Sequence, residues 1–274
     1  MDASSRESLA QARERLGQRT SGAPGQTLLN LGDELFAVAR LLEGEPSLRR
    51  ALSDPGVKPA DRAGLAQRLL RGKVSDTALD LVETVARLRW SRPMDLVLAA
   101  ETLATEAAFD AAVARGELDN VEDELFRFAR IVAGDSALSR ILSDRTAPVQ
   151  GKTELLSRLL SQRVGPTTAL LLRNVLTSSH VGNAENAIER LSEAASRRRG
   201  QDVAHVTTAV ALSAAQERRL TDVLSKLYRR PIGLQISVDP DVLGGLVIRV
   251  GDEVIDGSVA HRLEEAGRRL AGRA

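Results

Sequence analysis

Three histidines are the first candidates for chemistry, because imidazole side chains bind metals and act as general bases near neutral pH. They are His180, His205 and His261, and the sequence places them on a hairpin loop, a strand and a helix. A metal site or a serine triad would need convergent partners, and no spacing indicates convergence. Cysteine is absent, which excludes thiolate metal sites and a cysteine nucleophile. The sequence therefore predicts no catalytic residue and no metal site.

A group of carboxylates near the carboxyl end could suggest a calcium site. Its members are Asp239, Asp241, Asp252, Glu253 and Asp256. Their spacing does not match the D-x-[DN]-x-[DN]-G pattern of a calcium-binding loop. Aspartate is common at turns and caps, where its short side chain bonds the nearby backbone. We interpret these carboxylates as turn residues.

The pair Gly244-Gly245 could suggest a loop that binds phosphate. It lacks both the GxGxxG pattern and a following GK[ST], and the next residues, LVIRV, have the composition of a strand. Glycine at such a place can adopt backbone conformations that other residues avoid. We therefore expect no nucleotide and no other cofactor.

The run Arg197 to Arg199 could contact nucleic acid, but Lys and Arg together number 38 against 37 for Asp and Glu. No large basic face follows from that balance, and cations at the end of a helix interact favourably with its last carbonyl groups. Aromatic residues are 2% of the chain, so an aromatic pocket is not expected. We predict neither a nucleic-acid partner nor a small-molecule substrate.

No part of the sequence has the composition of a membrane span. The first residues, MDASSRESLAQARERLGQ, are charged, and no uncharged apolar stretch reaches the about 18 to 20 residues that a span requires. We therefore predict no direct membrane insertion, so that any membrane association would be through partners.

An internal repeat organises most of the 274 residues. Residues 31–70 align without gaps on residues 121–160, and 16 of the 40 positions are identical, where composition alone would give roughly 4. The identical pairs are Asp33/Asp123, Glu34/Glu124, Leu35/Leu125, Phe36/Phe126, Ala39/Ala129, Arg40/Arg130, Gly44/Gly134, Leu48/Leu138, Arg50/Arg140, Leu52/Leu142, Ser53/Ser143, Asp54/Asp144, Leu65/Leu155, Arg68/Arg158, Leu69/Leu159 and Leu70/Leu160. The chain contains a duplicated domain.

The repeat is helical. Its apolar positions 31, 35, 38 and 42 correspond to 121, 125, 128 and 132, which is the spacing of one helix face. Gly44 and Gly134 are expected to end these helices in the left-handed conformation. Asp54-Pro55 should end the next short helix, and Asp76 should cap a helix over 77–89. Pro166 should open the corresponding helix, to about Ser178, so each copy becomes a bundle of about six helices.

The junction between the copies is expected to be stiff. Pro93 opens a long alanine-rich segment that runs to Arg115, and no glycine or proline interrupts it before Gly116. The last helix of the first copy and the first helix of the second should both lie in this segment. We predict one continuous helix shared by the two bundles. The segment from Asn183 to Arg199 should be the corresponding last helix of the second copy.

After Gly200 the periodicity changes to that of strands. Residues 203–212 alternate and are rich in β-branched side chains, and Ser213 can cap a helix from Ala214 to about Arg229. The segments PIGLQISVDP and LGGLVIRV read as two further strands. Gly251-Asp252 suits a type II′ turn back into Glu253 to Asp256, and Ser258 can cap a last helix to about Ala271. This third part is a small α+β domain.

The segment from Val238 to Leu270, VDPDVLGGLVIRVGDEVIDGSVAHRLEEAGRRL, resembles the carboxy-terminal signature of the delta subunit of F-type ATP synthases, homologous to the mitochondrial oligomycin-sensitivity-conferring protein. Upstream, VTTAVALS resembles the strand that leads into the same domain, so the resemblance covers about residues 100–274. The first copy is additional to the usual subunit and is similar to the long actinobacterial form. The signature residues are Asp239, Pro240, Gly244, Gly245, Val250, Gly251, Asp252, Asp256, Gly257 and Ser258.

The resemblance implies a mechanical function. It implies a non-catalytic stator subunit at the cytoplasmic face of the bacterial cell membrane. Such a subunit binds the amino-terminal helices of alpha subunits and the b-type peripheral stalk, so that rotor torque is used for ATP synthesis. The alternative is a generic helical adaptor unrelated to ATP synthesis, for which the repeat alone would suffice. An enzyme with an unrecognised site is a third class, disfavoured because no titratable groups converge.

The predicted fold is mainly α, with two tandem helical bundles followed by a small α+β domain. The predicted domains are an additional diverged bundle over 1–103, a bundle over 104–200 that resembles the amino-terminal domain of the family, and a stalk-docking domain over 201–274. We expect the second bundle to hold the alpha-subunit helix, because it leads directly into the signature domain. The first bundle would then brace the stalk or a second alpha subunit.

Overall fold

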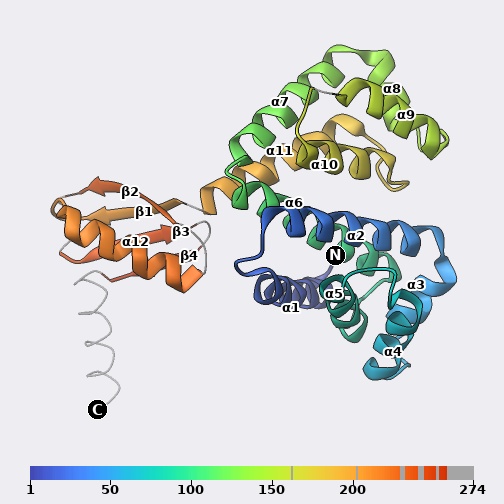
Figure 1. Cartoon of the computed structure of the whole chain (residues 1–274), viewed down its shortest axis with the longest axis horizontal. Helices are drawn as coiled ribbons and strands as arrows, with labels where there is room; N and C mark the ends of the chain where they lie inside the picture. The colour runs from blue at the N-terminus through green and yellow to red at the C-terminus, as the bar shows by residue number, and fades with distance from the viewer. Residues whose placement is uncertain (162, 202, 229–231, 240–243, 251–252, 258–274) are drawn as a thin grey trace. The chain divides into compact units, whose positions relative to one another are not determined.

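The computed structural model describes residues 1–161, 163–201, 203–228, 232–239, 244–250 and 253–257. Its contacts divide the chain into two compact units, Met1–Ala195 and Ser196–Ala274. The first unit is helical and the second combines a sheet with a helix (Figure 1). The predicted fold class, mainly α with a small α+β part, is confirmed.

The helices of the two copies match element by element. The first copy contains α2 (Gly25–Gly44), α3 (Pro46–Ser53), α4 (Pro59–Leu70) and α5 (Asp76–Arg87). The second contains α7 (Leu118–Gly134), α8 (Ser136–Ser143), α9 (Val149–Leu160) and α10 (Pro166–Thr177). The last three pairs are offset by 90 residues at both ends, which is the interval of the sequence repeat.

The two copies share a helix, as the sequence predicted. Helix α6 (Pro93–Ala114) is continuous. Adding the 90-residue repeat interval to α1 (Ala3–Thr20) gives residues 93–110, which lie inside α6. Adding it to the first residue of α6 gives residue 183, which lies next to the start of α11 (Ala184–Gln201). Helix α6 is therefore the last helix of one copy and the first of the next.

Helices α2 and α6 pack with their backbones unusually close, side by side in Figure 1. A Cβ atom placed on Gly32 would lie 3.1 Å from the carbonyl oxygen of Ala104 and 3.4 Å from the amide nitrogen of Ala108. These distances are shorter than ordinary van der Waals contact, so glycine favours that approach. The alanine-rich composition of α6 thus has a packing role, because small side chains let two helices come together.

One hydrophobic cluster runs through both copies. It includes Leu9 and Leu35 from the first, Leu103 from α6, and Leu171 and Ala195 from the second. The predicted boundary between residues 103 and 104 falls inside α6. The division of the helical part into two domains therefore stays a proposal.

Two predictions about helix ends are wrong. Gly44 and Gly134 do end α2 and α7, but neither is left-handed; among the described residues that conformation belongs to other glycines. The chain turns instead at Glu45 and Asp135, each of which also precedes the next helix directly. The cap of α5 is Ser75, whose side chain accepts a hydrogen bond from the amide of Ala78, and Asp76 is the first helical residue.

Each copy buries a cation at the same repeat position. Arg62 in α4 is 2% exposed and donates hydrogen bonds to five backbone carbonyl groups. The acceptors are Asp54 (2.7 Å), Val57 (2.9 Å), Ala86 (2.7 Å), Arg87 (2.9 Å) and Leu88 (3.1 Å). Its counterpart Lys152 in α9 is 5% exposed and donates to the carbonyl of Leu142 at 2.9 Å. Arg62 thereby ties α4 to the end of α5.

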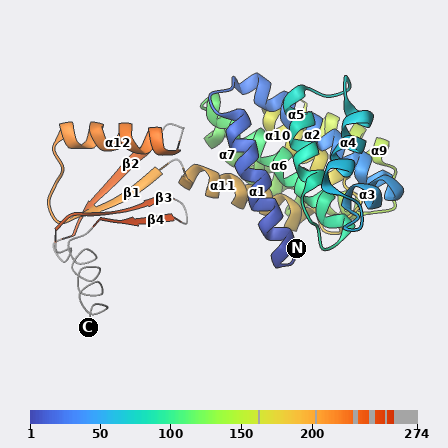
Figure 2. The ribbon, with the colours of Figure 1, turned by 90° about the horizontal axis from the view of Figure 1, so that it is seen from below.

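In its described residues, the second unit is a four-stranded sheet with helix α12 packed on one face (Figure 2). Its strands are β1 (Val203–Thr208), β2 (Gly233–Val238), β3 (Leu246–Val250) and β4 (Glu253–Asp256), in the order β2-β1-β3-β4. Strands β1 and β2 are parallel and joined through α12 (Ala214–Tyr228), while β3 runs antiparallel to β1 and β4. Ser213 caps α12 as predicted, exchanging hydrogen bonds with Gln216.

Some predictions lie outside the described residues. These are the start of β2 at Pro231, the turn at Gly251-Asp252 and the last helix from Ser258. Within the described part, β1 is shorter than the alternating segment, because it ends at Thr208. There the carbonyl oxygen of Thr208 accepts a hydrogen bond from the amide of Asp239 at 2.9 Å, which joins the ends of β1 and β2.

Candidate docking surfaces

The signature residues that the structure describes lie at strand ends and turns of the second unit. Gly244 and Gly245 precede β3 with φ angles of 78° and 81°, a conformation that favours glycine. Asp239 follows β2 and bonds through its backbone to Thr208. These positions shape the backbone, in agreement with the absence of a phosphate-binding pattern in the sequence.

The remaining described signature residues hold β3 and β4. Val250 is buried and pairs with Ala204 of β1, and Asp256 lies opposite Val247. The amide of Gly257 donates to the carbonyl of Leu246 at 2.9 Å, and a Cβ on this glycine would lie 3.2 Å from that oxygen. Pro240, Gly251, Asp252 and Ser258 lie outside the described residues. That the signature forms a docking surface stays a prediction.

Helix α12 presents apolar side chains away from the sheet. Leu224 is buried in the small core of the second unit. Val223 and Leu227, four residues apart, are 53% and 60% exposed. Side chains at this spacing share one helix face, so they form an apolar stripe, which is a common feature of partner surfaces. The sequence predicted α12 as a structural helix, and this stripe was not foreseen.

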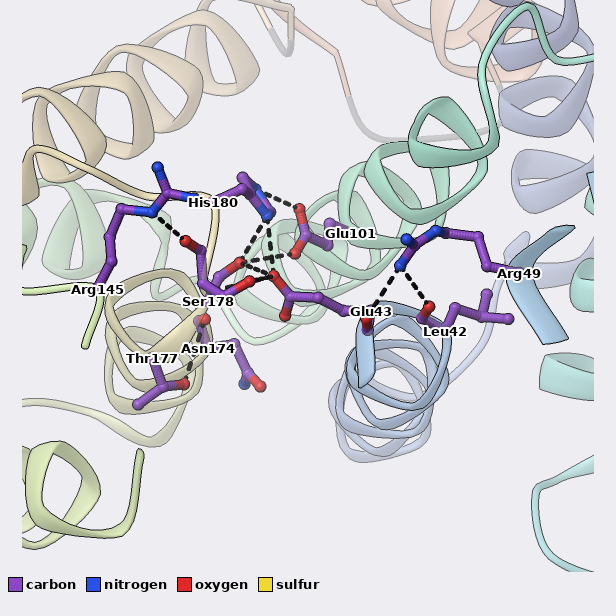
Figure 3. A network of polar contacts seen from close by, with 10 residues as sticks. Leu42, Glu43, Arg49, Glu101, Arg145, Asn174, Thr177, Ser178 and His180 are labelled. Atoms are coloured by element: carbon purple, nitrogen blue, oxygen red, sulfur yellow. Dashed lines mark hydrogen bonds and ion pairs between the residues drawn. The ribbon is translucent and has the colours of Figure 1, made fainter. Parts of the chain in front are cut away.

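A polar cluster joins the two copies within the first unit (Figure 3). His180, in the loop after α10, lies 3.3 Å through Nδ1 from Glu43 of α2 and 3.2 Å through Nε2 from Glu101 of α6. The amide and hydroxyl of Ser179 donate to Glu43 at 2.9 and 2.6 Å. The hydroxyl oxygen of Ser178 lies 2.8 Å from Nδ1 of His180, 3.2 Å from Glu43 and 3.4 Å from Glu101, so its single proton serves one carboxylate at a time. The cluster ties the α10 loop to α2 and α6.

The cluster is charged near neutral pH. The hydrogen bond with Glu101, and then that with Glu43, raises the pKa of His180 to about 9. Burial alone would raise the pKa of Glu43, but hydrogen bonds with His180 and Ser179 outweigh it and lower this pKa to about 2. The imidazolium of His180 provides a positive charge and hydrogen-bond donors to two partly buried carboxylates. We assign this cluster a structural role in joining the copies.

Helix α10 also contacts α2 directly. Arg173 lies 3.3 Å from Asp33, and Arg40 donates a hydrogen bond to the side-chain oxygen of Asn174. The sequence predicts a hairpin loop at His180 but none of these contacts. Glu43 is 137 residues away, and no local spacing signals such a contact.

In the described part of the chain, no group of three or more His, Cys, Asp or Glu side chains is placed to hold a metal ion. Among the same residues, no helix has the length and apolarity needed to cross a lipid bilayer.

Comparison with known proteins gives full-length relatives. A family model described as the ATP synthase delta (OSCP) subunit matches residues 104–270, beginning inside α6. The ATP synthase subunit delta of Streptomyces coelicolor is 50% identical over 271 residues, which cover 99% of this chain and 98% of the relative. That of Parafrankia sp. is 46% identical over 277 residues, covering 98% and 99%. The additional first copy is therefore shared with these relatives.

A further relative is longer than this chain. The ATP synthase subunit b-delta of Mycobacterium sp. (strain KMS) is 45% identical over 270 residues. The match covers 98% of this chain and 61% of the relative. The sequence of the present chain thus has a counterpart that is part of a larger polypeptide.

Proposed function

The chain belongs to the ATP synthase delta (OSCP) subunit family, and from this membership we propose that it is a non-catalytic stator subunit of a proton-translocating F-type ATP synthase. It links the catalytic head to the peripheral stalk, so that rotor torque is used for ATP synthesis. The observation that carries the proposal is the 50% identity over nearly the whole chain with a protein named ATP synthase subunit delta.

The b-delta relative supports a partner on the stalk side. Its name joins b with delta in one polypeptide, and the present chain corresponds to 61% of it. A natural fusion keeps two parts at high effective concentration, which suits parts that stay together during turnover. The b-type peripheral stalk is therefore the proposed partner on one side, and the amino-terminal helices of alpha subunits are the proposed partners on the other.

The architecture suits a mechanical connector. The two helical copies share α6 and one hydrophobic cluster, so a force on one copy is carried to the other through packed side chains. We propose that the second copy holds the alpha-subunit helix and that the first braces the stalk or a second alpha subunit. The signature residues of the second unit would form the stalk-docking part. The site of action is the cytoplasmic face of the cell membrane.

The proposal is tested with inverted membrane vesicles of a cell that makes this protein. Removing the chain should abolish ATP-driven proton pumping while the head retains ATP hydrolysis, and adding the purified chain back should restore pumping. Affinity purification of the tagged chain from a membrane extract should recover alpha, beta and b-type subunits. Pumping that persists without the chain would refute the stator function.

A further inference from the structure

The apolar stripe on α12, formed by Val223 and Leu227, lies on one flank of that helix. Leu220 and Leu224 face the core of the second unit, where Leu224 is buried. Each stripe residue follows one of these leucines by three positions, which places it about 60° around the helix from that leucine. The stripe therefore points to the side of α12, where a second helix on the same face of the sheet would lie.

The other flank of α12 is polar and is bonded within the chain. The hydroxyl of Thr221 donates to the carbonyl of Glu217 at 3.0 Å. The hydroxyl oxygen of Ser225 accepts a hydrogen bond from the amide of Ile232 at 3.1 Å. The two flanks of the helix thus differ, and the exposed large apolar side chains are on one of them.

The sheet face under α12 is apolar on every strand from β2 to β4. One row of paired residues crosses it, and its members are Ile236, Val206, Ile248 and Ile255. The two on the central strands are buried, whereas the two on the edge strands are only partly buried. Strands lie about 4.8 Å apart, so a sheet of four spans about 14 Å, more than the about 10 to 12 Å diameter of one helix. This face therefore has room for a second helix beside α12.

Residues 258–274, which we call the C-terminal segment, have a sequence that fits this place. They lie outside the described residues. Their apolar side chains recur at intervals of four, three and four positions, the spacing of one helix face, at Val259, Leu263, Ala266 and Leu270. A helix over 259–270 would span about 18 Å, close to the about 22 Å of α12. The segment is thus long enough to lie beside α12.

The strand directions bring the start of the C-terminal segment to the end of the sheet at which α12 also starts. Strands β1 and β4 both run antiparallel to β3, so both end at the same side. Helix α12 follows β1, and the segment follows Gly257, whose amide donates to the carbonyl of Leu246 at 2.9 Å. A helix that returns along the sheet from Gly257 would therefore run parallel to α12. The opposite face carries the exposed His205 and Arg249 and has less need of an apolar cover.

We propose that the C-terminal segment packs as a helix beside α12 and covers the stripe with its apolar face. Two exposed side chains are a small surface for a separate partner, since a standard interface buries about 800 Å² on each side. The segment needs no such area, because its attachment to β4 keeps it at a high effective concentration. The stripe then belongs to the core of the second unit, and the charged side of the segment, with Glu265 and Arg268, faces outward. The inference concerns the free chain and does not depend on the stator proposal.

The test is crosslinking within the purified full chain, which has no cysteine of its own. Val223→Cys combined with Ala266→Cys places two thiols that should face each other. The control pair is Asp222→Cys with Ala266→Cys, because Asp222 is exposed and lies two positions before the buried Leu224, on the opposite side of α12. A short thiol crosslinker should join the first pair about tenfold faster than the control pair, because only the first pair is held close together.

Two further changes show whether the apolar face makes the contact. Leu263→Glu in the first pair should lower the crosslinking rate by about tenfold, because it brings a charge into the apolar contact. Glutamate is a good helix former, so this change does not act by breaking the helix. Arg268→Glu, on the charged side, should leave the rate unchanged.

Three results would overturn the proposal. The first is an equal rate for the two cysteine pairs, and the second is a rate that Leu263→Glu leaves unchanged. The third is a product with twice the mass of the chain, which would assign the stripe to a second copy. Unchanged far-UV circular dichroism of each variant would show that a slow reaction reports position and not misfolding. The assay uses the isolated chain, so its failure is distinguishable from failure of the stator proposal in vesicles.

Discussion

Helices α2 and α7 bury the same core face and differ on the face beside it. Positions 31, 35, 38 and 42 of the first copy and 121, 125, 128 and 132 of the second are all buried. On the neighbouring face, Phe36 of α2 is 3% exposed, whereas the identical Phe126 of α7 is 56% exposed. The residues of a helix thus determine its core face, while the exposure of a second face depends on which element lies next to it.

The largest expected effect is a difference in stability between variants of the two phenylalanines, Phe36 and Phe126. Phe36→Ala should lower the free energy of unfolding by about 3 to 5 kcal/mol, because it leaves a cavity in a packed junction. Phe126→Ala, at an exposed position, should change it by less than about 0.5 kcal/mol. Urea unfolding followed by circular dichroism of the isolated chain measures both. Equal losses would show that Phe126 is covered in the free chain.

A smaller effect is expected from the buried cations. Arg62→Met should cost about 2 to 4 kcal/mol, because five carbonyl groups lose a charged donor. Lys152→Met, which removes one such hydrogen bond, should cost about 1 to 2 kcal/mol. The indole of Trp90 donates to the carbonyl of Val85 inside the first copy, so its fluorescence reports unfolding there. A larger loss from Lys152→Met would mean that the second copy depends more on its cation than the first.

An effect smaller than those of Phe36→Ala and Arg62→Met concerns the cluster that joins the copies, and it depends on pH. The pKa of His180 is about 9 when folded and about 6.5 when unfolded, so its stabilisation is complete below about pH 6.5 and is lost as pH rises toward 9. The full shift would correspond to about 3 kcal/mol, and solvent screening of the partly exposed imidazole should lower the loss to about 2 kcal/mol. Glu43 has the opposite pH dependence, because its pKa is lower in the folded chain, about 2, than its ordinary value of 4.5. Its stabilisation is therefore present above about pH 4.5 and is lost as the pH falls toward 2.

His180→Gln isolates this effect. The variant should remove most of the decline in stability between pH 6.5 and 9, measured by urea unfolding at a series of pH values. The exposed His205 provides a matched control, since His205→Gln should leave the decline unchanged. A decline that persists in His180→Gln would show that other groups cause it and that the cluster contributes little to joining the copies.

Much of the fold follows from local sequence. The helix pairs were predictable because the apolar residues recur at helical spacing and the copies are identical at many of those positions. The continuous α6 was predictable because nothing breaks the helix between Pro93 and Gly116. The conformation of Gly44 was not, since Pro46 begins a new helix at once and leaves no room for a left-handed turn.

The candidate surfaces were less predictable. The cluster around His180 forms only when α2, α6 and the α10 loop pack together, so it has no sequence motif. The difference between Phe36 and Phe126 has little local signal, because residues 33–36 are identical to 123–126. The replacements of Gly32 by Glu122 and of Ala37 by Arg127 do not by themselves show which phenylalanine is buried. Contacts between distant segments decide both, and helical periodicity does not report those contacts.

The shared helix α6 has a consequence for how such a gene can change. Both copies are built on one helix, so its residue count fixes the rotation of one copy relative to the other. Inserting a single residue within it would turn the second copy by about 100° and shift it by about 1.5 Å. Substitutions in α6 are therefore tolerable where small residues replace small ones, whereas single-residue insertions and deletions are expected to be eliminated by selection.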